Sequence, residues 1–255
     1  MRIRTIIKNI LPFFVVERYR HNCSTKLMEN FERNFQEKAK LLANERFSCD
    51  WNDILPCLND NTSNTSFDAH YIYHTAWAAR ILSKIKPREH IDIGSNLYFV
   101  TNVSAFVPIK FYDYRPANIN LSNLDCLHGD IISLPFADGS IESISCMHVV
   151  EHIGLERYGD PFDPQGDLKA MRELKRVLKP NGSLIFVVPL GSQMRIQYNA
   201  HRIYTFEYIC NCFKKFKLEN FAFITDDGLF LPDANENDVK EQKYGCGCFW
   251  FKRIE

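Results

Sequence analysis

The chain has 255 residues, which is long enough for one large α/β domain with an additional N-terminal segment. Its 31 basic and 31 acidic residues balance, so its net charge does not point to nucleic acid or an acidic polymer as a partner. No run of apolar residues is long enough to span a bilayer.

The nine cysteines are scattered through apolar runs without the paired spacing of a zinc site. Cys210 and Cys212 are separated by one residue, as are Cys246 and Cys248, which suits neither a zinc knuckle nor a redox pair. No secretory signal is recognisable at the N-terminus. We therefore expect buried, reduced thiols in a cytoplasmic protein and no metal site.

The first twenty residues have an amphipathic pattern. Their apolar side chains share one helical face, and the basic residues lie largely off it; the apolar set is Ile3, Ile6, Ile7, Ile10, Phe13 and Phe14. Such a helix can lie on an anionic membrane, which would place the protein at the inner face of the membrane. The alternative, which we favour, is a helix docked on its own domain or on a second subunit.

The sequence divides into a helical N-terminal extension, residues 1–66, and a second domain, residues 67–255. The extension contains an amphipathic helix over 28–44 and ends in a polar breaker cluster over 59–66, the best linker in the chain. The second domain opens with a helix over 68–84, whose expected buried side consists of Tyr71, Trp77, Ala78, Ile81 and Leu82.

From residue 88 onward, short apolar runs alternate with helical stretches. The predicted strands are 89–93, 108–113, 123–128, 141–147, 183–189, 217–225 and 245–254. A helix over 166–178 precedes the fifth strand, and another follows Thr205, its expected cap. This alternation predicts an α/β fold with a mostly parallel sheet and right-handed crossovers.

Three acids lie at or just beyond the carboxyl ends of successive predicted strands: Asp92, Asp113 and Asp130. Open α/β sheets bind ligands at the carboxyl ends of their strands. Asp113 suits a ribose, and its alternative role is to solvate a strand end. Asp130 suits an adenine amino group or, alternatively, an Asx turn over the next residues.

A glycine turn, Gly94-Ser95-Asn96, follows the first strand. Glycine lets the backbone approach a ligand closely, and amides at the next helix N-terminus attract a carboxylate or phosphate. Asn96 stands where a second glycine is usual. Asparagine is among the residues most tolerant of a positive φ.

Four blocks in order, over residues 90–95, 129–140, 149–153 and 173–188, resemble the class I S-adenosylmethionine-dependent methyltransferases. Within that superfamily, residues 158–171 and 199–204 are similar to a bacterial and nematode family of unassigned function, domain of unknown function 268. The resemblance covers about residues 68 to 227. It implies a Rossmann-like, seven-stranded sheet with helices on both faces and S-adenosylmethionine as cofactor.

The resemblance also implies roles for matched residues. It assigns the methionine end of the cofactor to Asp92, Gly94 and Ser95, the ribose to Asp113, the adenine to Asp130 and Ile131, and the sulfonium to Met147 and His148.

Methyl transfer from a sulfonium is an in-line displacement with an activated donor, so positioning does most of the work. A base helps when the acceptor is a hydroxyl or amine. Histidine titrates closest to neutral pH, which favours His201 and His152, followed by His148 with Asp163 and Glu151 behind them. Alternatively, His201 holds Asp163 or a carbonyl, and His152 orients the loop after the fourth strand.

Two further features leave alternatives open. His70 and His74 have a metal-like spacing on one helical face, but with no third ligand recognisable, pocket lining or surface placement is favoured. The loop over 160–167 carries Asp160, Asp163 and Asp167, a rigid acidic rim suited to a hydroxyl-rich or cationic acceptor. Alternatively, Asp167 caps the helix that follows.

The sequence therefore predicts a methyltransferase acting on an oxygen or nitrogen of a small-molecule or saccharide-type acceptor, with a role in surface-polysaccharide synthesis implied by the resemblance alone. One rival is a catalytically silent binding or scaffold subunit, favoured by the missing glycine. A nicotinamide-dependent oxidoreductase fits poorly, because residues 134–136, 151 and 152 would have no role in it.

Overall fold

The computed structural model describes residues 13–254, so the predictions made for residues 1–12 lie outside it. By its internal contacts the chain divides into two units, residues 1–66 and residues 67–255.

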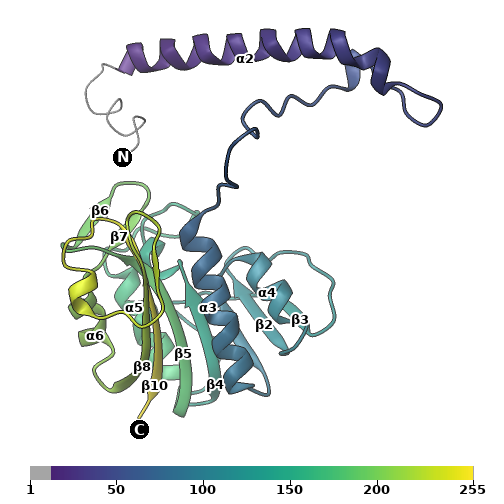
Figure 1. Ribbon diagram of the computed structural model, residues 1–255. Helices are drawn as coiled ribbons and strands as arrows, with labels where there is room; N and C mark the ends of the chain where they lie inside the picture. The colour runs from purple at the N-terminus through teal and green to yellow at the C-terminus, as the bar shows by residue number, and fades with distance from the viewer. Residues whose placement is uncertain (1–12, 255) are drawn as a thin grey trace. The chain divides into compact units, whose positions relative to one another are not determined.

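The first unit contains one long helix, α2 (Phe13–Leu42), and a short 3-10 helix, η1 (Trp51–Asp53) (Figure 1). Residues predicted to form separate helices around 1–20 and 28–44 thus belong in part to a single helix. The Trp51 ring packs on Phe31 and Phe35, with centroid distances of 6.3 and 5.0 Å. None of the helices in the described part of the chain is both long and apolar enough to cross a membrane.

The second unit is built on an eight-stranded sheet with the order β3-β2-β1-β4-β5-β10-β8-β9. The strands are β1 (His90–Ile93), β2 (Ile109–Asp113), β3 (Leu124–His128), β4 (Ile141–Met147), β5 (Leu178–Leu190), β8 (Phe216–Ile224), β9 (Phe230–Leu231) and β10 (Gly245–Arg253). Strands β1 to β5 are parallel, and β10 runs antiparallel to both β5 and β8. A separate hairpin pairs β6 (Arg195–Gln197) with β7 (His201–Ile203).

The predicted α/β class is confirmed, and the expectation of seven strands is wrong by one. The additional strand, β9, has only two residues and pairs with the end of β8. Strand β5 also begins earlier than predicted, because Leu178 already pairs with Ile141 before a register irregularity leads to the pair of Ser183 with Ser143.

Four helices flank the sheet: α3 (Ala69–Ile85), α4 (Leu97–Val103), α5 (Gly166–Val177) and α6 (Phe206–Cys212). Asp68 caps α3 by accepting from the Tyr71 amide at 3.1 Å, and Thr205 caps α6 as expected. Gln165 precedes α5 and makes no side-chain capping bond. The alternative in which Asp167 is the cap is therefore wrong, because Asp167 already lies inside the first turn.

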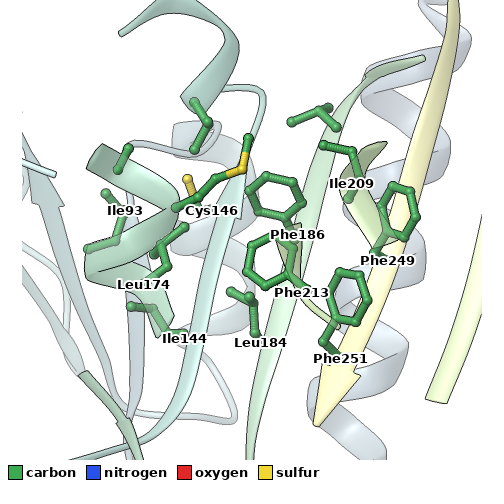
Figure 2. Packing of buried hydrophobic residues seen from close by; sticks show 14 of the residues in the cluster. Ile93, Ile144, Cys146, Leu174, Leu184, Phe186, Ile209, Phe213, Phe249 and Phe251 are labelled. Carbon is green, nitrogen blue, oxygen red and sulfur yellow. The ribbon is translucent and has the colours of Figure 1, made fainter. Parts of the chain in front are cut away.

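Apolar side chains fill both faces of the sheet, which follows from the alternation of strand residues. Along β5, Leu184, Phe186 and Val188 pack under α5 and α6 (Figure 2), whereas Ile185 and Val187 pack under α3 and α4. Four of the five residues predicted to form the buried side of α3 are buried. The prediction is wrong for Tyr71, which is 42% exposed.

The strand order fixes the position of the site. Strand β1 pairs with β2 on one side and with β4 on the other, so the sheet reverses its winding direction at β1. Open α/β sheets bind ligands in the crevice at the carboxyl ends of the strands at such a switch point. The residues that follow β1 to β4 therefore form the candidate site.

Candidate functional site

A cavity of about 630 Å³ opens at the carboxyl ends of β1 to β4. It is lined by Gly94 after β1, Asp113 at the end of β2, Asp130 and Ile131 after β3, and His148 after β4. The volume lies within the usual range for small-molecule and cofactor sites. This cavity, called the larger cavity because a smaller one adjoins it, thus brings together five of the eight residues predicted to bind the cofactor.

The turn after β1 requires glycine on two counts. Gly94 has φ +63, and a Cβ atom there would lie 3.2 Å from Cγ2 of Val149. Asn96, in contrast, has φ −62 and caps α4 by accepting from the Tyr98 amide at 2.8 Å. A positive φ is therefore not needed at position 96, and the absence of a second glycine does not distort the turn.

Asp113 and Asp130 each use one carboxylate oxygen in a local turn. Oδ1 of Asp113 accepts from the Arg115 amide at 2.7 Å, and Oδ1 of Asp130 accepts from the Ile132 amide at 3.0 Å. The second contact is the Asx turn weighed as an alternative. These turns use Oδ1, and both residues line the larger cavity. Oδ2 of each carboxylate can therefore accept from a donor on a ligand.

The other three predicted cofactor residues, Asp92, Ser95 and Met147, are buried and do not line the larger cavity. Oδ1 of Asp92 accepts from the Ser95 amide at 3.0 Å, and Oγ of Ser95 accepts from the Met147 amide at 3.2 Å. Burial raises the pKa of Asp92 to about 6. These residues join the ends of β1 and β4 behind the cavity wall.

A buried polar chain continues from Asp92 through the sheet. The Ser145 hydroxyl donates to Asp92, and the ring of His90 lies between Ser145 and Ser143, with 2.8 Å from a ring nitrogen to each hydroxyl. Burial lowers the pKa of His90 to about 3, so the ring is neutral. Sequence reasoning missed this chain, because it alternates between two strands.

The loop between η2 (Val150–His152) and α5 covers the larger cavity, and its acids are engaged locally. Asp160 accepts from the Gly154 amide at 2.6 Å, and Asp163 forms an ion pair with Lys169 at 2.6 Å. Asp167 is buried and accepts from the Tyr204 hydroxyl. Asp160 and Asp163 thus line the larger cavity as the predicted rim does, whereas Asp167 is buried, and all three carboxylates also hold the loop and its surroundings together.

A smaller cavity of about 390 Å³ adjoins the larger one. Three residues line both cavities: His148, His152 and Tyr158. The remaining lining includes aromatic and ionisable side chains from α3, η2 and the segments near β7 and β10, among them His70, Tyr71, Glu151, His201 and Tyr244. The two cavities thus share a wall of histidine and tyrosine.

The two predicted bases lie in this region. His201 stacks on Tyr244 with ring centroids 5.1 Å apart, and its buried Nε2 has no hydrogen-bond partner among the described residues. Nδ1 of His152 donates to the carbonyl of Ala200 at 2.7 Å, which ties η2 to the segment before β7. Burial lowers the pKa of both rings, so both favour the neutral form that accepts a proton.

His148 is held from both ring nitrogens. Nδ1 lies 2.9 Å from Oε1 of Glu151, and Nε2 lies 3.3 Å from Sγ of Cys246. The residue has φ 57, an uncommon conformation for a side chain other than glycine. Burial opposes charge on the ring, but Cys246 and Glu151 together raise the pKa of His148 above its usual value.

Sequence reasoning missed Cys246 at this site. It lies on β10, 98 residues from His148, and only the pairing of β10 beside β5 brings the two together. Nothing in the spacing of Cys246 and Cys248 indicates a histidine partner.

Comparison with known proteins gives partial matches in sequence. Residues 136–226 match the family described as Caenorhabditis protein of unknown function, DUF268. A demethylmenaquinone methyltransferase of Listeria monocytogenes is 26% identical over 151 residues, 57% of this chain and 53% of the relative. A demethylmenaquinone methyltransferase of Staphylococcus haemolyticus is 25% identical over 120 residues, which are 46% of this chain and 45% of the relative. The matches span about half the length of these relatives.

Two solved structures match over most of the chain. The N-methyltransferase NodS from Bradyrhizobium japonicum, in complex with S-adenosylhomocysteine, has a TM-score of 0.51 at 15% identity, covering 87% of this chain and 98% of its own. The 1,6-didemethyltoxoflavin-N1-methyltransferase of Burkholderia thailandensis has a TM-score of 0.52 at 9% identity, covering 92% and 90%. The resemblance to class I methyltransferases and to the DUF268 family is thus confirmed, and the chain has the methyltransferase fold.

Proposed function

We propose that the chain is an S-adenosylmethionine-dependent methyltransferase that acts on an oxygen or nitrogen of a small-molecule or saccharide-type acceptor. One observation carries the proposal: the turns after four parallel strands line a single cavity at the switch point of the sheet. The bound S-adenosylhomocysteine in two structural neighbours supports the choice of cofactor.

The cavity suits an adenosyl group. Oδ2 of Asp113 is available for the ribose hydroxyls, and Ile131 and Ile132 offer an apolar surface for adenine beside Asp130. Gly94 leaves open the space that a side chain would fill. Asp92, Ser95 and Met147 then act from behind the wall, where they position the turn that faces the methionine end.

When bound, the cofactor supplies an activated methyl group. The protein has to align the acceptor with it and exclude water, since most of the barrier reduction comes from positioning. His148, between the two cavities, would lie beside the transferred group. His201, neutral and with an unpartnered Nε2, is the base we propose for an acceptor in the smaller cavity, and His152 is the second candidate.

The smaller cavity supports a small acceptor rather than a macromolecule. Its aromatic lining from Tyr71, Tyr158 and Tyr244 suits a ring, including a sugar ring. The names of the relatives support a small acceptor: they concern demethylmenaquinone and 1,6-didemethyltoxoflavin. A role in surface-polysaccharide synthesis and a cytoplasmic location are part of the proposal.

Calorimetric titration of the full chain with S-adenosylmethionine, S-adenosylhomocysteine and NAD tests the proposal. S-adenosylmethionine and S-adenosylhomocysteine are each expected to bind at one site per chain, and NAD is expected not to bind. Binding of NAD alone would overturn the assignment. Transfer of labelled methyl from the cofactor to a panel of small hydroxyl and amine acceptors then separates an active enzyme from a silent scaffold, which binds the cofactor without turnover.

A further inference from the structure

Three potential metal ligands meet at His148, which lies in the wall that the two cavities share. They come from distant segments: His70 from the first turn of α3, His148 from the turn after β4, and Cys246 from β10. One ligand atom from each lies within 4.8 Å of the others. In the sequence His70 is paired by spacing with His74 and no third ligand is recognisable; in the folded chain His148 and Cys246 join His70 instead.

The spacing of the atoms suits a zinc-like ion. Bonds of about 2.1 Å to nitrogen and about 2.3 Å to sulfur, at a roughly tetrahedral angle, separate the two ligand atoms by about 3.6 Å. Nε2 of His148 lies 3.3 Å from Sγ of Cys246, so an ion needs only a small displacement of the two side chains. The ring of His70 lies parallel to that of His148 with centroids 6.1 Å apart, and one of its nitrogens is within 4.8 Å of the other two ligand atoms.

The surroundings of His148 are those of a metal ligand. Its other ring nitrogen lies 2.9 Å from Oε1 of Glu151, and a ligating histidine usually donates that N–H to a carboxylate. The Glu151 side chain is 1% exposed, which makes it a costly group to bury unless it neutralises positive charge nearby. An ion bound through His148 and Cys246 supplies that charge.

The ring of a further histidine lies close to the three ligands. His74 is one turn along α3 from His70, and its ring centroid is 5.0 Å from that of His148. The neighbouring His74 is fully buried, and its Nε2 has no partner in the described part of the chain. The Cys246 thiol would lose its proton when a metal binds.

We infer that His70, His148 and Cys246 hold one divalent transition-metal ion of the zinc class, with a coordination position open toward the smaller cavity. Three protein ligands with one open position is the pattern of catalytic rather than structural zinc sites. Resting on the proposed function, the open position would take the oxygen or nitrogen of the acceptor that receives the methyl group. The metal site itself does not depend on the identity of the cofactor.

The experiment uses the full chain, stripped with a chelator and titrated with Co²⁺ as a spectroscopic probe. One ion per chain is expected, with a thiolate-to-cobalt charge-transfer band and intense visible bands typical of four coordination. Zn²⁺ should displace the cobalt. Azide should shift the visible bands, because it can enter the open position.

Variants assign the ligands. Cys246→Ser should abolish the charge-transfer band, and Glu151→Gln should weaken affinity roughly 10–100-fold, as loss of an outer partner does. His70→Gln, at a half-buried position, should weaken the affinity for cobalt at least as much. This variant tests the site if Cys246→Ser does not fold. Cys126→Ser and His128→Gln on β3 are matched controls that should leave both band and affinity unchanged.

Several results would overturn the inference: no saturable cobalt binding, a cobalt complex without the thiolate band, or a band retained in Cys246→Ser. Rapid alkylation of Cys246 by iodoacetamide in the metal-free chain, not slowed by Zn²⁺, would instead assign a nucleophilic Cys–His–Glu arrangement. Titration of S-adenosylhomocysteine on the same preparations separates the two proposals, because failure of cofactor binding leaves the cobalt spectrum unaffected.

Discussion

Oδ2 of Asp113 lies 3.6 Å from the position that a Cβ atom would take on Gly94. The carboxylate that ends β2 and the turn that follows β1 therefore border the same small volume. Any side chain at position 94 would enter that volume and also meet Val149, so the two positions can be tested together.

Gly94→Ala should weaken binding of S-adenosylhomocysteine at least tenfold. The added methyl group occupies cavity space, and the positive φ costs a further ~1–2 kcal/mol of stability. Gly159→Ala is the matched control, because Gly159 has φ +84 but its Cβ would meet nothing within 4 Å. The control should share the loss of melting temperature and keep its affinity in calorimetry. Equal loss of affinity in both variants would contradict the role of the Gly94 turn.

Asp113→Ala should weaken S-adenosylmethionine and S-adenosylhomocysteine alike. Loss of a hydrogen-bond acceptor for the ribose costs about 1–3 kcal/mol, or roughly 5–150-fold in the dissociation constant. Adenosine, which carries the same ribose, should lose affinity by a similar factor in the same titration. Asp125→Ala, on the exposed part of β3, should bind like the original chain. An unchanged affinity for adenosine in Asp113→Ala would remove the ribose assignment.

Asn96→Gly should leave cofactor affinity unchanged. The backbone at position 96 has φ −62, so glycine gains no conformational advantage there, and only the cap bond to Tyr98 is lost. Replacing an asparagine cap by glycine costs a few tenths of a kcal/mol. A marked rise in affinity for S-adenosylmethionine would instead show that the asparagine restricts the site.

This position illustrates what the sequence could and could not predict. The fold could be predicted from the strand and helix pattern after residue 88, because the continuous apolar run of β5 indicates a strand that is buried on both faces of a sheet. The residue at 96 looked like a defect only because its backbone angle was unknown. The angle depends on the cap that starts α4, which a single residue type does not specify.

The site was predictable where it depends on strand ends and not where it depends on pairing between distant strands. Asp113 and Asp130 follow apolar runs, so their shared edge follows from topology alone. Cys246 reaches His148 only through the antiparallel insertion of β10 next to β5. Asp92 lies near the end of β1, and its carboxylate bonds to two serines, a contact that only the packed sheet creates.

Asp92→Asn should flatten the pH dependence of stability. Burial raises the pKa of Asp92 from 3.8 to about 6, so the favourable contribution of the neutral acid is complete below about pH 4 and is lost as the pH rises through 6. A shift of about two units corresponds to roughly 3 kcal/mol. Urea unfolding at pH 4.5 and 7 should give a smaller difference for Asp92→Asn than for the original chain, whereas Asp125→Asn should not change it. An equal difference in all three would refute the buried acid as its source.

Tyr204→Phe should loosen the loop over the larger cavity. The Tyr204 hydroxyl donates to Oδ2 of buried Asp167 at 3.0 Å, and Asp167 also lies 3.7 Å from Nε of Arg202. Arg202 in turn donates to the carbonyl of Ile153 at 2.8 Å, so one network connects α5, the strand β7 and the start of the loop.

Removing the hydroxyl leaves a buried carboxylate oxygen without its donor, which costs about 1–3 kcal/mol in the free energy of unfolding. Amide hydrogen exchange over residues 153–166 should accelerate, because the loop depends on Arg202 staying in place. Tyr198→Phe is the control, since that side chain is 98% exposed and its hydroxyl holds nothing in this network. Unchanged exchange in Tyr204→Phe together with full stability would show that the loop is held by its own acids alone.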